Sequence, residues 1–247
     1  MRVVGVIPSR WGSTRLPGKS LLPICGKPLV QHVVERARAC KELDALLVAT
    51  DDQRIADAVA SFGGDAVMTR ADHPSGTDRI AEAVADIDAD LIVNIQGDEP
   101  LLQASLLDRL VREMRSQTWD MGTAAAPIRD EGTLESPSVV KVIFDANHAA
   151  LYFSRAVIPF NRDGALYWEA DGKPIYWRHI GIYAYRRTFL QRMVAAPPCE
   201  AEKMEKLEQL RALHLGCRMF VVETDEQSIG VDTQADLELV ERLMGGQ

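Results

Sequence analysis

The chain has 247 residues, of which 47% are hydrophobic and 26% are charged, and this composition is typical of a globular domain with a sizeable core. Its net charge of −8 and pI of about 5.2 argue against a broad basic surface for nucleic acid and favour a small ligand in a local pocket. The sequence shows no signal-peptide pattern, no apolar run of membrane-spanning length and no Cys-x-x-Cys pair among its four cysteines, so we predict a cytoplasmic protein with reduced thiols and no membrane insertion.

The first half of the chain alternates apolar runs with amphipathic segments. Continuous apolar runs predict buried strands, and apolar residues three and four positions apart predict helices. The predicted strands are 3–7, 45–50, 66–68 and 91–96, and the predicted helices are 27–39, 53–62, 77–85 and 105–115. This alternation indicates an α/β protein with a mainly parallel sheet covered by helices on both faces. Ligands of such sheets bind beyond the carboxyl ends of the strands.

The second half has a less regular pattern. The predicted strands are 139–145, 151–154, 181–185 and 219–222, the predicted helices are 202–215 and 235–244, and 161–174 is predicted to be a loop. No repeat or linker interrupts the chain. We therefore predict a single domain over 1–247 that contains, at approximately 139–215, a small lobe for binding a second substrate.

The segment 8–19 follows the first predicted strand and reads Pro-Ser-Arg-Trp-Gly-Ser-Thr-Arg-Leu-Pro-Gly-Lys. Small residues let backbone N–H groups approach an oligophosphate, and the cations Arg10, Arg15 and Lys19 can neutralise it. Gly12 lies one residue too far from Gly18 for a Walker A loop, and no Gly-x-Gly-x-x-Gly occurs. A solvated basic turn is the alternative, but the position directly after a buried strand favours a phosphate-binding loop.

Two aspartates on separate predicted turns are candidate metal ligands. Asp98 follows the strand 91–96, and Asp232 precedes the final helix. Magnesium is commonly held by one or two carboxylates together with phosphate oxygens. A turn or helix-cap role is the alternative for each aspartate. The basic loop favours a shared Mg²⁺ site, whereas Asp52 is predicted to cap helix 53–62.

Seven segments together resemble the bacterial 3-deoxy-manno-octulosonate (Kdo) cytidylyltransferases, also called CMP-Kdo synthetases. These segments are 10–19, 73–79, 94–100, 152–155, 178–183, 205–211 and 230–233. The resemblance runs from the first strand to the last helix. It implies a Rossmann-like, glycosyltransferase-A-like nucleotidyltransferase fold, a homodimer formed through the small lobe, and Mg²⁺-dependent transfer of CMP from CTP to Kdo for lipopolysaccharide synthesis.

The resemblance also implies roles for individual residues. The implied catalytic residues are Arg10, Lys19, Asp98 and Asp232, with both aspartates holding the magnesium. The implied CTP contacts are Arg10, Ser13, Thr14, Arg15, Lys19, Arg70, Ser75, Gly76, Thr77 and Gln96. The implied sugar contacts are Gln96, Arg155, His179, Tyr183, Glu205 and Gln209. Glu205 and Gln209 are four residues apart and would share one face of helix 202–215.

Plainer roles remain open for several of these residues. Ser75 can cap a helix while contacting the base, His179 can be structural, and Tyr183 can belong to the core. Trp11, Ser20 and Phe160 depart from the family pattern, which leaves an acceptor such as 8-amino-Kdo open. Competing functions are those of a cytidylyltransferase for a sialic-acid type of sugar, a sugar-1-phosphate nucleotidyltransferase and a non-catalytic CTP sensor.

Overall fold

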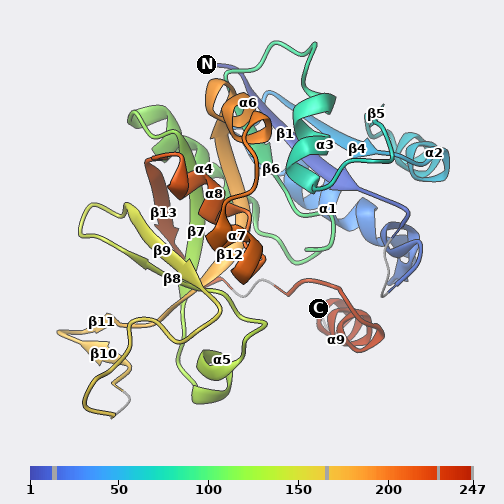
Figure 1. Cartoon of the computed structure of the whole chain (residues 1–247). Helices are drawn as coiled ribbons and strands as arrows, with labels where there is room; N and C mark the ends of the chain where they lie inside the picture. Colours follow the sequence, from blue (N-terminus) through green and yellow to red (C-terminus); the bar gives the residue numbers. More distant parts are fainter. Residues whose placement is uncertain (13–15, 165–166, 227–228, 246–247) are drawn as a thin grey trace.

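The computed structural model describes residues 1–12, 16–164, 167–226 and 229–245. Its centre is a mixed, mostly parallel sheet with the strand order β13-β7-β12-β6-β1-β4-β5 (Figure 1). On one side of this sheet, β1 pairs in parallel with both β4 and β6, and β4 pairs in parallel with β5. These strands are β1 (Val3–Ser9), β4 (Ala45–Thr50), β5 (Ala66–Met68) and β6 (Leu91–Asn94). The predicted parallel arrangement of the first half is confirmed.

The other side of the sheet is formed by the second half of the chain. The long strand β12 (Trp177–Arg186) is antiparallel to both of its neighbours, β6 and β7 (Met121–Pro127). Strand β13 (Met219–Glu223) pairs in parallel with β7 and ends the sheet. Because β12 joins β6 to β7, the two halves share one continuous sheet.

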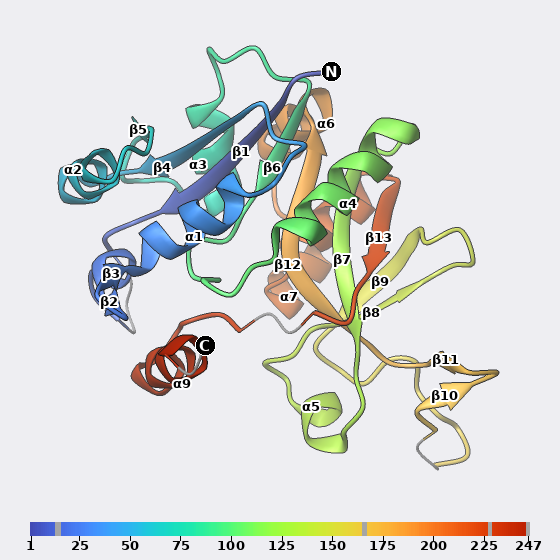
Figure 2. The same cartoon turned by 180° about the vertical axis from the view of Figure 1, so that it is seen from behind.

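Helices cover both faces of the sheet, as Figures 1 and 2 show from opposite sides. One face carries α1 (Leu29–Arg38), α2 (Gln53–Ser61) and α4 (Ala104–Ser116), and the other carries α3 (Gly76–Ala83) and α6 (Arg187–Ala195). Alternate residues of β1 enter different cores: Val3 and Ile7 pack with α1, and Val4 and Val6 pack with α3. This alternation follows from the two-residue period of a strand.

The small lobe extends from β12. Strand β8 (Lys141–Phe144) pairs with β12 and with β9 (Ala150–Ser154). The rest of this region consists of α5 (Glu131–Glu135), the hairpin of β10 (Glu169–Ala170) and β11 (Lys173–Pro174), α7 (Glu200–Glu205) and α8 (Gln209–His214). The hairpin and α5 lie at the lower end of the molecule in Figure 1.

The last helix returns to the beginning of the chain. Leu237 and Val240 of α9 (Gln234–Gly245) pack with Ile24 and Leu29 in a separate apolar cluster. Ile24 belongs to the hairpin of β2 (Pro23–Ile24) and β3 (Lys27–Pro28), which follows the short 3₁₀ helix η1 (Lys19–Leu21). This cluster holds the C-terminal turn beside the basic N-terminal loop.

Some predicted elements were wrong. The predicted helix 202–215 is two helices, because Lys206 adopts a left-handed conformation with φ 54° and ends α7. Strand β7, helices α5 and α6, the short helix η1 and the hairpin of β2 and β3 were not predicted, and the predicted loop 161–174 contains the hairpin of β10 and β11. The sequence of β7, Met-Gly-Thr-Ala-Ala-Ala-Pro, lacks the large branched residues that usually mark a buried strand. No helix in the described part of the chain is long and apolar enough to cross a membrane.

Candidate active site at the carboxyl ends of the strands

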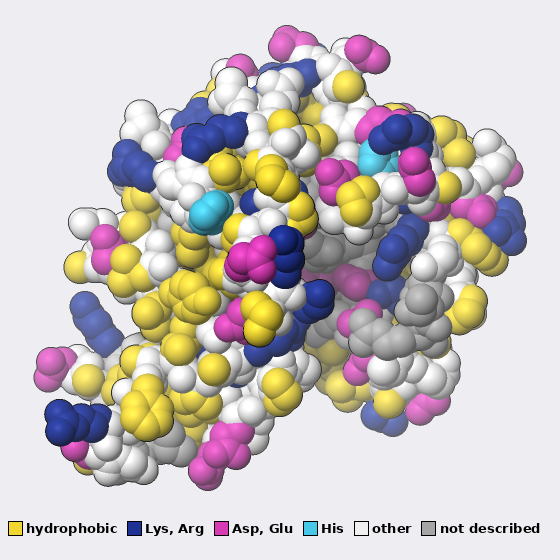
Figure 3. Space-filling model, in the orientation of Figure 1, with side chains coloured by type: hydrophobic (Ala, Val, Ile, Leu, Met, Phe, Trp, Pro, Cys, Tyr) yellow, Lys and Arg dark blue, Asp and Glu magenta, His cyan; other side chains and the backbone are white. Residues whose placement is uncertain are grey.

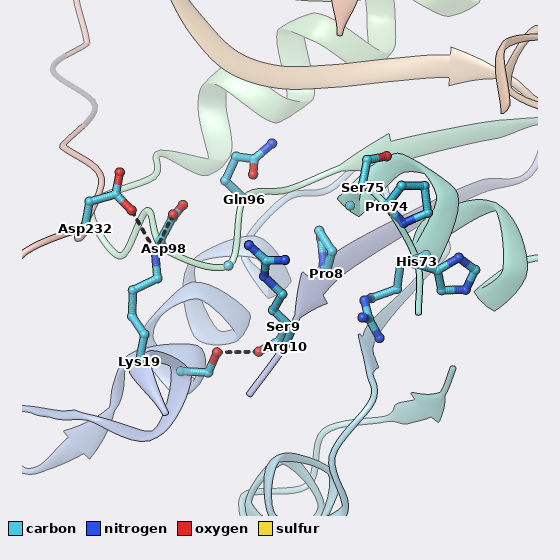
Figure 4. A pocket seen from close by; sticks show the side chains of 14 residues that line it. Pro8, Ser9, Arg10, Lys19, His73, Pro74, Ser75, Gln96, Asp98 and Asp232 are labelled. Carbon is cyan, nitrogen blue, oxygen red and sulfur yellow. Dashed lines mark hydrogen bonds and ion pairs between the residues drawn. The ribbon is translucent and has the colours of Figure 1, made fainter. Parts of the chain in front are cut away.

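A cavity of about 300 Å³ lies at the carboxyl ends of β1 and β6. Residues from four separate segments line it: the end of β1, the start of η1, the beginning of α3 and the turn after β6, joined by Asp232 before α9. Figure 3 shows the molecule hollowed between its two halves, and Figure 4 shows the lining side chains. The site therefore forms where an open α/β sheet is expected to bind its ligand.

Lys19, Asp98 and Asp232 meet at one wall of the cavity. The Lys19 ammonium donates to Asp98 Oδ2 at 2.7 Å and to Asp232 Oδ1 at 3.0 Å (Figure 4). The backbone N–H of Val231 donates to the carbonyl of Asp98 at 2.8 Å, so the two aspartate-bearing turns are bonded directly to each other. The two carboxylates thus converge on one cation position.

The chemistry of this pair fits a magnesium ion. Carboxylate oxygens are hard ligands, and Mg²⁺ usually takes only one or two of them while retaining water and phosphate oxygens. No group of three or more His, Cys, Asp or Glu suited to a metal occurs among the residues that the structure describes. Asp98 and Asp232 can supply two carboxylate ligands, which is the number that Mg²⁺ commonly takes beside phosphate oxygens.

The basic loop contributes a second cation. Arg10 follows the last residue of β1, is exposed and lines the cavity, and its guanidinium has no hydrogen-bond partner within the described residues. Beside it, the Ser9 hydroxyl donates to Ser20 Oγ at 2.6 Å and joins β1 to η1. Ser13, Thr14 and Arg15 lie outside the described residues. Lys19 has to break its ion pairs before it can bind an anionic ligand, whereas Arg10 has no ion pair with a carboxylate of the described residues to break.

The beginning of α3 forms the opposite wall. Ser75 caps the helix by accepting from the N–H of Asp78, and Ser75 and Gly76 both line the cavity. The cap role of Ser75, and likewise the predicted cap role of Asp52, is confirmed. Thr77 is buried and does not line this cavity, and its hydroxyl donates to Glu208 Oε2 at 2.8 Å.

Arg70 also lies away from the cavity lining. Its exposed guanidinium pairs with Asp72 at 3.7 Å and with Glu82 at 3.6 Å. Gln96 does line the cavity, and its amide donates to the carbonyl of Gly181 at 2.8 Å. Gln96 therefore joins the cavity to β12, the strand that carries His179 and Tyr183.

The other predicted sugar contacts lie on β12 and in the lobe, and they do not line this cavity. Glu205 accepts from the Ser154 hydroxyl at 2.6 Å and from the Arg155 N–H at 2.9 Å. The Arg155 guanidinium donates to the carbonyls of Glu205 and Pro137. Glu205 ends α7 and Gln209 is the first residue of α8. The expectation that they share one face of a single helix was therefore wrong.

Burial determines the charge state of His179 and Tyr183 on β12. His179 Nε2 lies 2.8 Å from Thr123 Oγ1, and burial lowers the pKa of His179 to about 3, so the imidazole is neutral near pH 7. Burial raises the pKa of Tyr183, and its ring centroid lies 5.4 Å from that of His179. Neither side chain therefore supplies a charge near pH 7.

Sequence reasoning missed several lining residues, including Arg79, and it also missed Glu208, which does not line the cavity but bonds to Ser75 at its wall. The buried Arg79 lines the cavity and donates to Asp51 Oδ2 at 3.0 Å, and Glu208 accepts from both Ser75 and Thr77. Both lie inside segments that carried the resemblance, 73–79 and 205–211. Their partners come from distant segments, so the sequence offered no signal for these contacts.

A family model described as "Cytidylyltransferase" matches residues 4–225. The chain belongs to this family. A 3-deoxy-manno-octulosonate cytidylyltransferase of Geobacter sulfurreducens is 48% identical over 97% of this chain and 98% of the relative. An 8-amino-3,8-dideoxy-manno-octulosonate cytidylyltransferase of Shewanella halifaxensis is 47% identical over 98% of both chains.

The fold comparison agrees with the sequence comparison. A solved structure described as CMP:2-keto-3-deoxy-manno-octonic acid synthetase complexed with CTP is 43% identical, has a TM-score of 0.93 and covers 100% of this chain and 99% of its own. The expected membership among the 3-deoxy-manno-octulosonate cytidylyltransferases is confirmed, as is the Rossmann-like nucleotidyltransferase fold.

Proposed function

We propose that this chain transfers CMP from CTP to the anomeric hydroxyl of Kdo and releases pyrophosphate. The observation that carries the proposal is the convergence of Lys19, Asp98 and Asp232 at the carboxyl ends of the strands, in a cavity that Arg10 also lines. Phosphoryl and nucleotidyl transfer depends chiefly on positioning and charge neutralisation, and this wall offers both cations and carboxylates for that purpose.

The two sides of the cavity take different parts of CTP in this proposal. Arg10 and Lys19 bind the triphosphate and stabilise the departing pyrophosphate, together with Ser13, Thr14 and Arg15. Ser75, Gly76 and Gln96, which line the cavity, would contact the base. Contacts of the base with Arg70 and Thr77 stay predictions, because both side chains engage protein partners elsewhere.

Asp98 and Asp232 would hold a magnesium ion. When bound, the ion would neutralise the α-phosphate and favour deprotonation of the attacking hydroxyl. Lys19 must then exchange its carboxylate partners for phosphate oxygens. This exchange keeps the number of charge-assisted hydrogen bonds roughly constant while moving the ammonium to the triphosphate.

The lobe would bind the sugar acid. Gln96 connects the cavity to β12, so a sugar placed beside Gln96 would extend along His179 and Tyr183 toward Arg155 and the α7–α8 region with Glu205 and Gln209. Homodimer formation through this lobe and a cytoplasmic location also belong to the proposal. Sedimentation and cell fractionation test these two points independently of catalysis.

Pyrophosphate release tests the function. We expect release only when CTP, Kdo and Mg²⁺ are all present, with little release when ATP, GTP or UTP replaces CTP. Because one relative is named for 8-amino-3,8-dideoxy-manno-octulosonate, the acceptor panel pairs Kdo with its 8-amino analogue and a sialic acid. CTP binding without turnover for any of these acceptors would favour a non-catalytic CTP sensor.

A further inference from the structure

Among the described residues of the segment that joins β1 to η1, the cations Arg10 and Lys19 line the cavity. Arg10 follows β1, and Lys19 begins η1. The N–H of Gly18 donates to the carbonyl of Trp11 at 3.2 Å. This hydrogen bond joins the residue after Arg10 to the residue before Lys19. The separation of the two cations therefore depends on the contact between Trp11 and Gly18.

The Trp11 ring packs directly on Gly18. A Cβ atom on Gly18 would lie 2.9 Å from one atom of the indole and 3.2 Å from two others, which is closer than side chains normally approach. Gly18 also has φ +67°, a conformation that residues with a side chain rarely adopt. Glycine at this position thus permits the backbone conformation of the turn and leaves room for the indole ring.

Arg54 provides a contact to the Trp11 ring from α2. Its guanidinium carbon lies 3.4 Å from the ring centroid, within the range of a cation–π contact. Two hydrogen bonds to the carboxylate of Asp52, at 2.8 and 2.6 Å, orient this guanidinium. The indole is therefore held by contacts from two different segments of the chain.

The backbone of Trp11 is anchored to the cavity wall. Its N–H donates to Asp51 Oδ1 at 3.2 Å, and the other oxygen of Asp51 accepts from Arg79 at 3.0 Å. Arg79 is buried, lines the cavity and also donates to the hydroxyl of Thr69 at 2.5 Å. The loop is thus connected through Asp51 to the helix that forms the opposite wall.

We propose that Trp11 is a positioning residue whose indole, held by Gly18 and Arg54, sets the spacing of Arg10 and Lys19 for the triphosphate of CTP. This inference rests on the proposed function, because it concerns the same nucleotide. Trp11 does not line the cavity, so it acts through the loop and not through contact with the substrate.

Substitution of Trp11 tests the proposal. We expect Trp11→Ala to raise the Kd and KM for CTP about tenfold, because small displacements of positioned charges are costly, while the KM for Kdo stays near the unaltered value. Trp11→Tyr, which keeps a flat ring, should recover most of the CTP affinity. Arg54→Met, which removes the cation and keeps an apolar stem, should give a smaller loss in the same direction.

Gly18 allows a matched comparison. Gly63 has a similar φ of +71°, but a Cβ atom there would meet nothing within 4 Å, so Gly63→Ala measures the backbone strain alone. We expect Gly18→Ala to weaken CTP binding and Gly63→Ala to leave it unchanged. In a Trp11→Ala background the further loss from Gly18→Ala should shrink, because the ring that it would strike is gone.

Three results would overturn the inference. One is CTP affinity within about twofold of the unaltered chain in folded Trp11→Ala. Another is a loss of CTP affinity from Gly18→Ala that is as large in the Trp11→Ala background as in the unaltered chain. The third is equal loss of affinity for CTP and Kdo, which indicates general damage. If Trp11→Ala does not fold, Arg54→Met and Gly18→Ala decide. Failure of the unaltered chain to bind CTP would instead refute the proposed function.

Discussion

Lys19 connects three segments that lie far apart in the sequence. Its ammonium has 15% side-chain exposure and bonds to two carboxylates, one of them 213 positions away along the chain. A cation shared by two acids offsets their mutual repulsion, which would otherwise raise the free energy of the folded state. The same atoms can exchange partners when a metal–nucleotide complex enters.

Replacing Asp98 by asparagine tests the proposed metal site. Asp98→Asn keeps the size of the side chain and a bond to Lys19, so the Tm should change little. Pyrophosphate release should fall about a hundredfold or more, because one of two anionic metal ligands is lost. A near-normal rate at ordinary Mg²⁺ concentration would remove Asp98 from the metal site.

Lys19→Ala should weaken CTP binding by roughly ten- to a hundredfold, the usual value of a hydrogen bond to a charged group. Isothermal titration with CTP and Mg²⁺ measures this change. Lys27→Ala is the matched control, since Lys27 forms an exposed ion pair with Glu35 outside the cavity. An equal effect of the two substitutions would point to general electrostatics and refute a direct contact by Lys19.

Because the helix is interrupted between α7 and α8, Glu205 and Glu208 bond to different parts of the molecule. Glu205, at the end of α7, bonds to Ser154 and to the backbone of Arg155 in the lobe. Glu208, just before α8, accepts from Ser75 at 3.1 Å and from Thr77 at 2.8 Å, both at the beginning of α3. One short segment therefore connects the lobe to the helix that forms a wall of the cavity.

Glu208 makes the stability of the chain depend on pH. Burial raises the pKa of Glu208 above its ordinary value of 4.5, despite its hydrogen bonds to Thr77 and Ser75. Below the pKa that Glu208 has in the unfolded chain, its carboxyl is protonated in both states and no charge is buried. As the pH rises through the pKa of the folded state, the buried carboxyl becomes charged and the free energy of unfolding falls. Glu208→Gln stays neutral, so it should gain stability relative to the unaltered chain as the pH rises.

Urea unfolding near pH 4.5 and near pH 7.5 measures this difference in the free energy of unfolding. Glu200→Gln is a suitable control, because Glu200 is exposed and lies in the adjacent helix α7. A stability difference for Glu208→Gln that is constant over this range, or that falls with pH, would contradict the assignment.

The C-terminal helix α9 packs against a segment near the N-terminus of the chain. Leu237 and Val240 pack on Ile24 and Leu29, and this cluster also contains Val231, the neighbour of Asp232. Packing of the last helix therefore determines where one of the two converging carboxylates lies. The final segment completes the site although it adds no strand to the sheet.

Leu237→Ala should lower the free energy of unfolding by about 2–3 kcal/mol, the usual cost of truncating a buried leucine. It should also lower turnover, because the turn that carries Asp232 loses its support. Leu239→Ala, on the same helix but 38% exposed, should change stability by less than about 0.5 kcal/mol and leave turnover intact. Unfolding curves and pyrophosphate release of the two variants measure both effects, and equal losses would contradict the role of the cluster.

The sequence by itself determined the parallel strands β1, β4, β5 and β6, the helices α1 to α4, the phosphate-loop candidate after β1 and the family. Those features depend on local periodicity and on short motifs, which are properties of neighbouring residues. The sequence also predicted that Asp98 and the basic loop would approach each other, because both follow strands whose carboxyl ends meet at one edge of the sheet.

Only the tertiary structure decided the remaining features. Strand β7 was hidden because small residues satisfy the tight packing between sheet and helix, as at Gly122, where a Cβ atom would lie 2.8 Å from Leu110. The bridge from Glu208 to α3 and the contacts of Trp11 with Arg54 and Asp51 depend on partners that are distant along the chain. Such contacts are selected by the packing of the whole molecule, and no local pattern encodes them.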